Sequence, residues 1–255
     1  MSDLFSLQGR TALVTGGSRG IGRMIAAGFL AQGATVYISS RKAGACDEAA
    51  QQLAALGPCF SLPADVSTVE GARGLAAAYR QRATTLDILV NNAGAAWGES
   101  FDTFPENGWD KVVDLNLKAP FFLCQALHGE LRRAAGARPA KVINIASIDG
   151  ISVNPQETYS YAASKAGLIH LTRRLSLRLV QDNIVMSGIA PGAFASNMNQ
   201  AARDHGDELA RRIPARRIGT AEDMAGAAIY LASRAGDYVV GETIVVDGGV
   251  TLARG

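Results

Sequence analysis

A tyrosine and a lysine four residues apart form the pair in this sequence best suited to proton transfer. They are Tyr161 and Lys165, in segment 159–165. In a helix, residues four apart share one face, whereas Tyr159, six residues before Lys165, lies on the far side. A phenol titrates near ~10 in water, and a nearby cation favours the phenolate, so Lys165 is expected to lower the pKa of Tyr161. Taken alone, the pair also fits a half-buried tyrosine packed along a lysine stem.

A glycine-rich turn near the N-terminus is a second candidate site. The apolar run 11–14 leads into the turn 15–22, with the sequence TGGSRGIG, and an alanine-rich apolar segment follows at 24–31. Glycines let backbone N–H groups approach a ligand, and the start of a helix favours an anion. The order strand, turn, helix predicts a pyrophosphate site, although Gly-x-x-x-Gly-x-Gly differs from the common Gly-x-Gly-x-x-Gly. A glycine turn that binds no nucleotide is the alternative.

The next predicted strand, at 35–40, indicates which nucleotide would bind. It ends at Arg41, and no acidic residue follows until Asp47. An acidic side chain at this place would hold the ribose 2′-hydroxyl of NAD, whereas an arginine suits the 2′-phosphate of NADP. Arg41 and Arg19 are therefore expected to bracket that phosphate, which predicts NADP(H) as cofactor. Two exposed arginines without a ligand are the alternative.

Three further polar residues lie at predicted strand ends or inside a predicted helix. Asp65 ends an apolar run, where it could meet an adenine or cap a helix that starts near Ser67. Ser147 lies just past the C-terminal end of a predicted strand, which is where open parallel sheets bind ligands. Asn116 stands among apolar neighbours in a long helix predicted over 107–131, so it needs hydrogen-bond partners if buried.

The order of the predicted elements indicates an α/β fold. Strand and helix patterns alternate along the chain of 255 residues, with no linker, repeat or low-complexity tract. This predicts one doubly wound, Rossmann-type domain over 1–255, with a mostly parallel sheet of about seven strands and helices on both faces. Residues 193–217 have no strong strand pattern and many charges, so we expect them to form a helical flap over the substrate.

Composition argues against several other classes of protein. With 25 Lys and Arg against 23 Asp and Glu the formal charge is +2, so no nucleic-acid partner is expected. Cys46, Cys59 and Cys124 fit neither a disulfide framework nor a zinc motif and are expected to be reduced thiols in the core. The histidines have no ligand spacing, so no metal is expected. No leader-like start or membrane-spanning stretch is seen, which predicts a cytoplasmic location without membrane contact.

Taken together, the motifs resemble those of the short-chain dehydrogenase/reductase family. The resemblance covers essentially the whole chain, and within the family it is greatest to the 3-oxoacyl-thioester (β-ketoacyl) reductases, including those associated with rhamnolipid formation. The motifs that match in order and spacing are Thr15-Gly16-x-x-x-Gly20-x-Gly22, Asn91-Asn92-Ala93-Gly94, Asn116, Ser147, Tyr161-x-x-x-Lys165, Pro191-Gly192 and Asp247-Gly248-Gly249.

The resemblance implies an NADP-dependent oxidoreductase and a role for each matched residue. Ser147 would bind the substrate carbonyl, Tyr161 would deliver the proton, and Lys165 would lower the pKa of Tyr161 and bind the nicotinamide ribose. Asn116 would hold a water that links Lys165 to solvent. Cofactor contacts are implied for Gly16, Ser18, Arg19, Gly20, Ile21, Gly22, Arg41, Asp65, Val66, Asn91, Asn92, Ala93, Gly94, Tyr161, Lys165, Ile189, Pro191, Gly192 and Ser196.

Two positions depart from the usual family pattern. Ser187 stands where an asparagine is usual, so local repacking is expected there. Ser196 takes the place of a threonine that contacts the carboxamide, and it keeps the hydroxyl. Neither change alters the expected reaction class.

Three functions follow from these residues and the resemblance. The first is NADPH-dependent reduction of a 3-oxoacyl thioester, carried by an acyl carrier protein or coenzyme A. The second is oxidation or reduction of a sugar, polyol or other small alcohol or ketone. The third is a non-catalytic NADP-binding regulator, although a non-enzyme has no physical need for all four predicted catalytic residues.

The sequence leaves the substrate and its partners open. Apolar flap residues could line an acyl groove or pack on the core, and several arginines could receive carrier phosphates or be solvated. By resemblance, the protein is expected to form a homodimer or homotetramer through its long helices. The residues concerned are Phe194, Met198, Leu209 and Ile213 in the flap, and Arg132, Arg133, Arg138, Arg173 and Arg174.

Overall fold

Seven parallel strands form the centre of the described part of the chain. The structure is a computed structural model that describes residues 3–196, 202 and 204–253. The strands lie in the order β3-β2-β1-β4-β5-β6-β7, and every neighbouring pair is parallel. The predicted Rossmann-type fold is confirmed, with a wholly parallel sheet. The bounds are β1 Thr11–Thr15, β2 Thr35–Ser39, β3 Cys59–Ser61, β4 Ile88–Asn91, β5 Ala140–Ile145, β6 Ile184–Pro191 and β7 Thr243–Val246.

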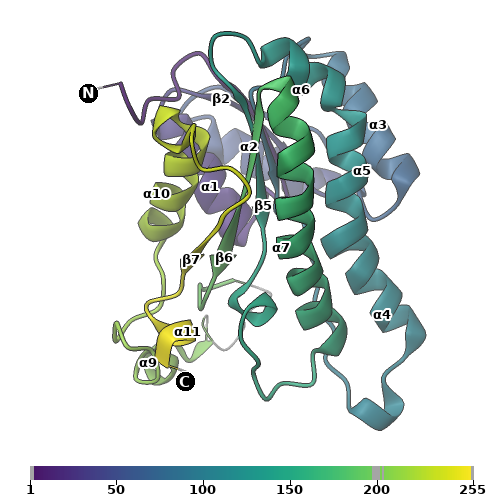
Figure 1. Ribbon diagram of the computed structural model, residues 1–255, viewed down its shortest axis with the longest axis vertical. Coiled ribbons are helices and arrows are strands. Elements are labelled where there is room, and N and C mark those ends of the chain that lie inside the picture. The colour runs from purple at the N-terminus through teal and green to yellow at the C-terminus, as the bar shows by residue number, and fades with distance from the viewer. Residues whose placement is uncertain (1–2, 197–201, 203, 254–255) are drawn as a thin grey trace.

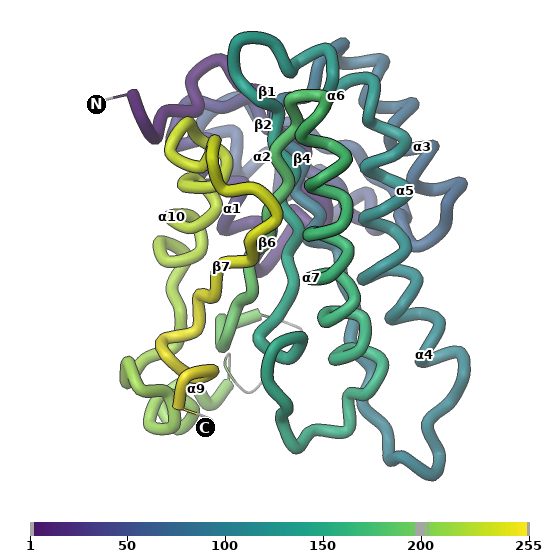
Figure 2. The backbone as a smooth tube through the Cα atoms, viewed as in Figure 1, coloured from purple at the N-terminus to yellow at the C-terminus, as the bar shows by residue number. Residues whose placement is uncertain are grey.

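Helices cover both faces of the sheet (Figure 1). Helices α1, α2 and α10 pack on one face, and α3, α5 and α7 pack on the other. The tube in Figure 2 shows α4, α5 and α6 following one another beside α7. The bounds are α1 Gly20–Ala31, α2 Ala43–Leu53, α3 Val69–Arg80, α4 Glu106–Val113, α5 Ala119–Ala126, α6 His128–Ala134, α7 Tyr159–Leu179, α9 Gly206–Ala210, α10 Ala221–Ala232 and α11 Val250–Ala253.

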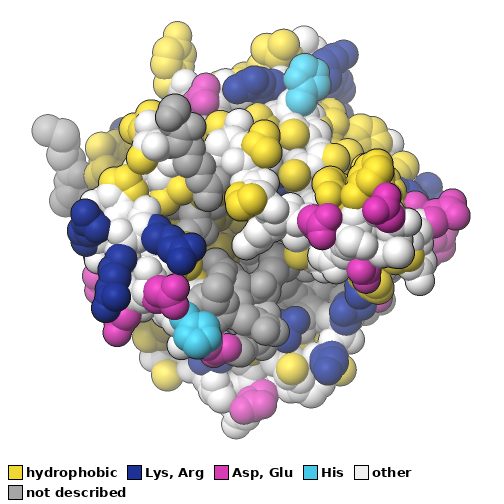
Figure 3. All heavy atoms as spheres, turned by 90° about the horizontal axis from the view of Figure 1, so that it is seen from below, with side chains coloured by type: hydrophobic (Ala, Val, Ile, Leu, Met, Phe, Trp, Pro, Cys, Tyr) yellow, Lys and Arg dark blue, Asp and Glu magenta, His cyan; other side chains and the backbone are white. Residues whose placement is uncertain are grey.

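The carboxyl ends of all seven strands point to one end of the molecule. This end is at the bottom of Figure 1, and Figure 3 looks onto it. The turn after β1, the residues after β5 and the first turn of α7 meet there. The strand order reverses between β1 and β4, and ligands of open α/β sheets bind outside such a switch point.

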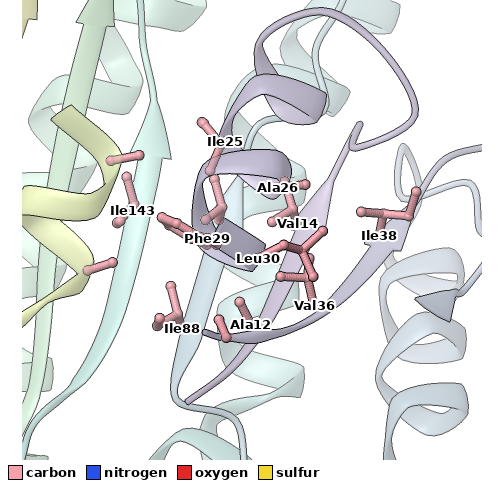
Figure 4. Close-up of a cluster of buried hydrophobic side chains, with 14 of the residues drawn as sticks. Ala12, Val14, Ile25, Ala26, Phe29, Leu30, Val36, Ile38, Ile88 and Ile143 are labelled. Atoms are coloured by element: carbon pink, nitrogen blue, oxygen red, sulfur yellow. The ribbon is translucent and has the colours of Figure 1, made fainter. Parts of the chain in front are cut away.

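Successive residues of each strand supply the cores on the two faces. Ala12 and Val14 of β1 face the cluster beneath α1, where Phe29 is fully buried, while Leu13 faces the opposite cluster. Figure 4 shows side chains of β1, β2, β4 and β5 meeting those of α1 in the first cluster. Because both faces are covered, the strands are continuously apolar, which is why they could be recognised in the sequence.

The long helix predicted over 107–131 is interrupted in the structure. A π-helical turn, Asp114–Lys118, separates α4 from α5, and α6 begins only at His128. Pro120, near the start of α5, has no N–H to give to the carbonyl of Asn116, so a regular α-helical bond is unavailable there. Turns of this kind often lie at functional sites, and Asn116 is at the middle of this one.

The predicted flap is described only in part. Its described residues form α9 and a bridge between Phe194 and Gly219. Phe194 and Ile213 are buried in the protein interior, which favours the packing alternative for these two. Met198 lies outside the described residues. That the segment covers a substrate stays a prediction.

The helix-capping alternative for Asp65 is wrong. Helix α3 begins at Val69, and Thr68 is its N-cap, because the Thr68 hydroxyl accepts a hydrogen bond from the Gly71 N–H at 3.0 Å. Asp65 instead accepts one from the Ser67 N–H at 3.0 Å. The Asp65 carboxylate therefore holds the loop between β3 and α3.

A buried lysine in β5 generates a prediction about stability. Lys141 is 1% exposed, and its Nζ lies 2.7 Å from Oδ1 of Asp237; burial lowers the pKa of Lys141, and Asp237 opposes that shift. Replacing Asp237→Asn leaves this cation without its charge partner, so we expect a loss of about 3 kcal/mol in the free energy of unfolding, measured in urea. The exposed pair of Lys118 and Asp114 provides the control. Lys118→Ala should cost less than about 1 kcal/mol, and equal losses would contradict the account.

Candidate active site

Tyr161, Lys165 and Ser147 come together where β5 and α7 meet. The Nζ of Lys165 is 5.6 Å from the centre of the Tyr161 ring, which confirms that the two share a helix face. Ser147 follows β5 directly, its hydroxyl is hydrogen-bonded with Tyr161, and it also accepts a bond from the Asp149 N–H at 3.1 Å. A Cβ on Gly150 would lie 2.6 Å from the carbonyl carbon of Lys165. Gly150 is therefore what lets the Ser147 loop approach α7, a requirement that sequence reasoning missed.

The electrostatics of the pair differ from the expectation. Desolvation raises the pKa of Tyr161 to about 12, and the hydrogen bond with Ser147 opposes this rise. Burial lowers the pKa of Lys165 to about 8, and its Nζ donates a 2.7 Å hydrogen bond to the Ile145 carbonyl. The expectation that Lys165 lowers the pKa of Tyr161 is not met in this structure, because the ammonium is directed at that carbonyl and desolvation dominates.

Asn116 joins the loop after β4 to the catalytic helix. Its Oδ1 accepts from the Ala95 N–H at 2.8 Å, while its Nδ2 donates to the Ala95 carbonyl at 2.9 Å and to the Ser164 hydroxyl at 3.0 Å. Ser164 in turn donates to the Tyr161 carbonyl at 2.8 Å. The amide of Asn116 thus connects the loop after β4 to α7, and that Asn116 also holds a water stays a prediction. Sequence reasoning missed Ser164, although its position three residues after Tyr161 was a usable signal.

The glycine turn is built by backbone conformation and by two polar side chains. Gly16 and Gly20 have φ values of +66° and +54°, in the left-handed region that favours glycine. A Cβ on Gly22 would lie 2.4 Å from the Gly16 carbonyl oxygen. Asn92 Nδ2 donates to the Thr15 carbonyl at 2.8 Å, and the Thr15 hydroxyl accepts from the Asn92 N–H at 3.0 Å. Asn92 therefore shapes the turn, and Thr15 was a partner that the sequence did not reveal.

The residues expected around the adenosine half are only partly grouped. Arg41 Nη1 lies 3.9 Å from Asp65 Oδ2, and both side chains are at least half exposed. Arg19 is exposed at the N-cap of α1, where no side chain caps the helix. Val66 is buried in the core, and Asn91 donates to Asn144 Oδ1 at 2.8 Å, so both have structural roles.

The segment after β6 lies at the same carboxyl end of the sheet, beside the glycine turn. A Cβ on Gly192 would lie 2.7 Å from the Cβ of Asp247, so only glycine allows this approach. Ser196 lies beside the glycine turn, because a Cβ on Gly20 would be 3.3 Å from its Cβ. Ser187 donates to the Val239 carbonyl at 2.5 Å, which is the local accommodation expected of its hydroxyl.

Two of the arginines considered for carrier phosphates have structural partners instead. Arg133 pairs with the buried Glu130 at 2.5 Å, and Arg132 lies 3.5 Å from Asp182. These residues precede β5, so they lie at the amino ends of the strands, opposite the site. Their interpretation as phosphate receptors is wrong.

Other chemistries find no support in the described residues. No group of three or more His, Cys, Asp or Glu side chains there could hold a metal ion. Cys46, Cys59 and Cys124 are buried free thiols, as expected. No described helix is long and apolar enough to cross a membrane.

The bond from Ser164 to the Tyr161 carbonyl generates a prediction. Ser164→Ala removes the connection between Asn116 and α7, so we expect about a fivefold loss of kcat with little change in KM for the cofactor, since one buried hydrogen bond contributes about 1 kcal/mol. Ser176→Ala is the matched control, because Ser176 makes the same type of bond to Arg173 further along α7, at 2.8 Å. Equal effects of the two variants on kcat would contradict a positioning role for Ser164.

The sequence and the fold were compared with known proteins. A family model described as enoyl-(acyl carrier protein) reductase matches residues 16–251. The chain is 47% identical over 256 residues to the rhamnolipids biosynthesis 3-oxoacyl-[acyl-carrier-protein] reductase of Pseudomonas aeruginosa, covering 99% of this chain and 100% of that protein. It is 39% identical over 262 residues to the 2-dehydro-3-deoxy-D-gluconate 5-dehydrogenase of Dickeya dadantii, covering 98% of each.

The solved structures agree with the sequence matches. The RhlG/NADP active-site complex of Pseudomonas aeruginosa has a TM-score of 0.95 to this chain at 47% identity, covering 98% of this chain and 100% of that one. The matches extend over the glycine turn, the Tyr161 helix and the last strand alike. The chain therefore belongs to the short-chain dehydrogenase/reductase family of NAD(P)-dependent oxidoreductases.

Proposed function

We propose that this enzyme transfers hydride from NADPH to the ketone of a 3-oxoacyl thioester and releases the 3-hydroxyacyl product. The observation that carries the proposal is the grouping of Ser147, Tyr161 and Lys165 at the carboxyl ends of the strands. Support for the substrate class comes from the Pseudomonas aeruginosa relative, which is similar over its full length and is named as a 3-oxoacyl-[acyl-carrier-protein] reductase.

Tyr161 is the proposed proton donor. A phenol with a pKa of about 12 keeps its proton at neutral pH, which suits a donor in the direction of reduction. As the carbonyl carbon accepts hydride, negative charge develops on its oxygen, and the Ser147 hydroxyl donates a hydrogen bond to that oxygen. The O–H bond of Tyr161 breaks and its proton passes to the same oxygen. Solvent then returns a proton to the phenolate, while Lys165 keeps its place against the Ile145 carbonyl.

NADP(H) is the proposed cofactor, and it supplies the hydride. The turn 15–22 fits a pyrophosphate, because its left-handed glycines lead into the start of α1, where no side chain caps the helix. Arg19 and Arg41 would receive the 2′-phosphate, and the similar Pseudomonas structure is described as an NADP complex. Lys165 would bind the nicotinamide ribose. Further contacts are proposed for Gly16, Ser18, Gly20, Ile21, Asp65, Ala93, Gly94, Ile189, Pro191, Gly192 and Ser196.

The second candidate function is oxidation or reduction of a sugar acid or another small alcohol. It is favoured by the Dickeya dadantii relative, whose name gives a deoxygluconate substrate. One scaffold can serve both substrates, since the reacting groups are the same and only the loops around them differ. An acyl carrier protein or coenzyme A as carrier, and a homodimer or homotetramer as assembly, remain proposals.

The decisive experiment follows NADPH consumption by the purified enzyme with short- and long-chain 3-oxoacyl-CoA, with NADH in parallel. Tyr161→Phe should lower kcat by about a thousandfold, because it removes the proton donor. Tyr238→Phe is the matched control and should change kcat by less than about twofold, because Tyr238 is 99% exposed before the start of β7, at the end of the sheet away from the site. If the enzyme reduces 5-ketogluconate rapidly but reduces none of the thioesters, the thioester proposal is refuted and the second candidate function is left.

The lowered pKa of Lys165 predicts how the rate depends on pH. Its positive charge is lost as pH rises through about 8, so kcat/KM for reduction should decline above that pH. Unfolding is not the cause, because the unfolded chain holds this proton more tightly than the folded chain, so this group stabilises the fold as pH rises from about 8 towards 10.5. A pH–rate profile with parallel thermal melts measures both effects. A rate that stays constant to about pH 10 would contradict the assignment.

A further inference from the structure

Two unlike surfaces flank the candidate active site at the carboxyl ends of the strands. Figures 1 and 3 place α9 on one side and α4 on the other, with the first turn of α7 and the loop after β5 between them. Figure 3 shows Lys and Arg side chains together with acidic ones on the α9 side, and hydrophobic and acidic side chains on the α4 side. A substrate with an apolar end and an anionic end would be oriented by this difference.

The α4 side carries a cluster of aromatic side chains, which we name the aromatic arm. Tyr159 contacts Phe101 and Phe104 edge to face, with ring centroids 5.9 Å and 5.8 Å apart, and Phe104 contacts Trp109 at 6.3 Å. Phe101 is nevertheless 74% exposed. A contiguous group of exposed aromatic side chains, unlike a single one, is typical of a binding surface.

The aromatic arm is fixed to the start of the catalytic helix. Glu157 accepts hydrogen bonds from the Phe101 N–H at 3.3 Å and from the Tyr159 hydroxyl at 3.2 Å, and its carbonyl accepts from the Glu99 N–H at 3.2 Å. Tyr159 is two residues from Tyr161. An apolar ligand that covers Phe101 would therefore lie against an already ordered surface beside the reacting groups, so little ordering entropy is lost.

The charge on the arm excludes phosphates from it. Glu99, Asp102, Glu106 and Glu157 are all exposed there, whereas the nearby cation Lys111 lies 5.0 Å from the ring of Trp97, which is outside the arm. Phosphates close to these carboxylates would be repelled. The apolar part of a ligand fits this side and the anionic part does not.

The α9 side differs in that exposed arginines follow its acidic residues: Asp207 and Glu208 lie on α9, and Arg211, Arg212, Arg216 and Arg217 come directly after it. Arg212 is paired with Glu208 at 3.3 Å and Arg217 with Asp223 at 2.5 Å, whereas Arg211 and Arg216 have no carboxylate within ion-pair distance among the described residues. Arg216 donates to the Arg211 carbonyl at 2.7 Å and has a φ of +59°, a conformation that is uncommon for an arginine. Two guanidinium groups without a carboxylate partner, one of them held by its bond to the Arg211 carbonyl, are suited to phosphate oxygens.

We propose that a thioester substrate crosses the site in one direction, with its acyl chain over the aromatic arm and its phosphate-bearing pantetheine portion over Arg211 and Arg216. The inference rests on the proposed function, because it assumes an acyl thioester as substrate. It makes Phe101 the residue that selects acyl length and the two arginines the residues that select the carrier.

The test uses one acyl group on three carriers. The 3-oxoacyl group is presented as a thioester of coenzyme A, of phosphopantetheine and of N-acetylcysteamine, which has no phosphate, in four-carbon and twelve-carbon forms. Phe101→Ala should lower kcat/KM for the long chain about tenfold and for the short chain less than about twofold, on every carrier, because each buried methylene strengthens binding about threefold. Phe60→Ala is the matched control, since Phe60 is 47% exposed in β3 on the far edge of the sheet.

The double variant Arg211→Ala with Arg216→Gly should show the reverse selectivity. Glycine suits the φ of +59° at position 216, so the fold should be kept. kcat/KM should fall about tenfold for carriers with phosphate and stay unchanged for N-acetylcysteamine thioesters, at both chain lengths. If kcat/KM falls with both phosphate-bearing carriers, the two arginines bind the pantetheine phosphate. If kcat/KM falls with coenzyme A alone, they bind its nucleotide phosphates. Arg212→Ala is the control, because Arg212 is already paired.

The outcomes separate this inference from the proposed function. Turnover of N-acetylcysteamine thioesters by the wild type supports the function by itself. If that turnover occurs and Phe101→Ala affects both chain lengths equally, or the double variant affects all carriers equally, the orientation is wrong and the function stands. A raised KM for NADPH in the double variant would assign the arginines to the cofactor and also overturn the orientation. If NADPH binds but no thioester is reduced, both the proposed function and the proposed orientation are wrong.

Discussion

The burial of Lys165 against the Ile145 carbonyl is the interaction on which the rest of the site depends. A lysine ammonium without water needs acceptors nearby, and here the last residue of β5 supplies one at 2.7 Å. That contact fixes α7 relative to the end of β5, and so it also fixes Tyr161 relative to Ser147. Gly150 makes the approach possible, because a side chain there would meet the backbone of Lys165. Desolvation keeps the pKa of Lys165 near 8, close to the pH at which an enzyme works.

A chain of hydrogen bonds extends this arrangement to the next strand. It passes from the backbone of Ala95 after β4, through Asn116 and Ser164, to the carbonyl of Tyr161. The π-helical turn presents Asn116 at the point where these groups meet. Because the partners come from three different elements, a shift in any one of them would move the proposed proton donor. The site is therefore a property of the packed sheet edge and not of α7 alone.

The separation of chemistry from recognition explains why relatives with different substrates share this fold. The proposed reacting groups lie just after β5 and at the start of α7, elements that are held by the two cores, while the surfaces around them belong to loops. The named relatives include a 3-oxoacyl reductase and a sugar-acid dehydrogenase at 47% and 39% identity. In this chain, those loops place aromatic and acidic side chains on one side and arginines on the other. That difference is the physical basis on which a long, partly apolar substrate would be distinguished from a small polar one.

The sequence alone determined the fold class, the parallel strands and the shared helix face of Tyr161 and Lys165. This was possible because helices cover both faces of the sheet, which makes each strand continuously apolar. A spacing of four residues also places Tyr161 and Lys165 on one helix face. Only the tertiary structure decided the partners of Asn116, the role of Ser164, the direction of the Tyr161 pKa and the location of Arg132 and Arg133 away from the site. Desolvation and hydrogen-bond partners depend on atoms far apart in the chain, so the spacing of residues along the sequence does not predict them.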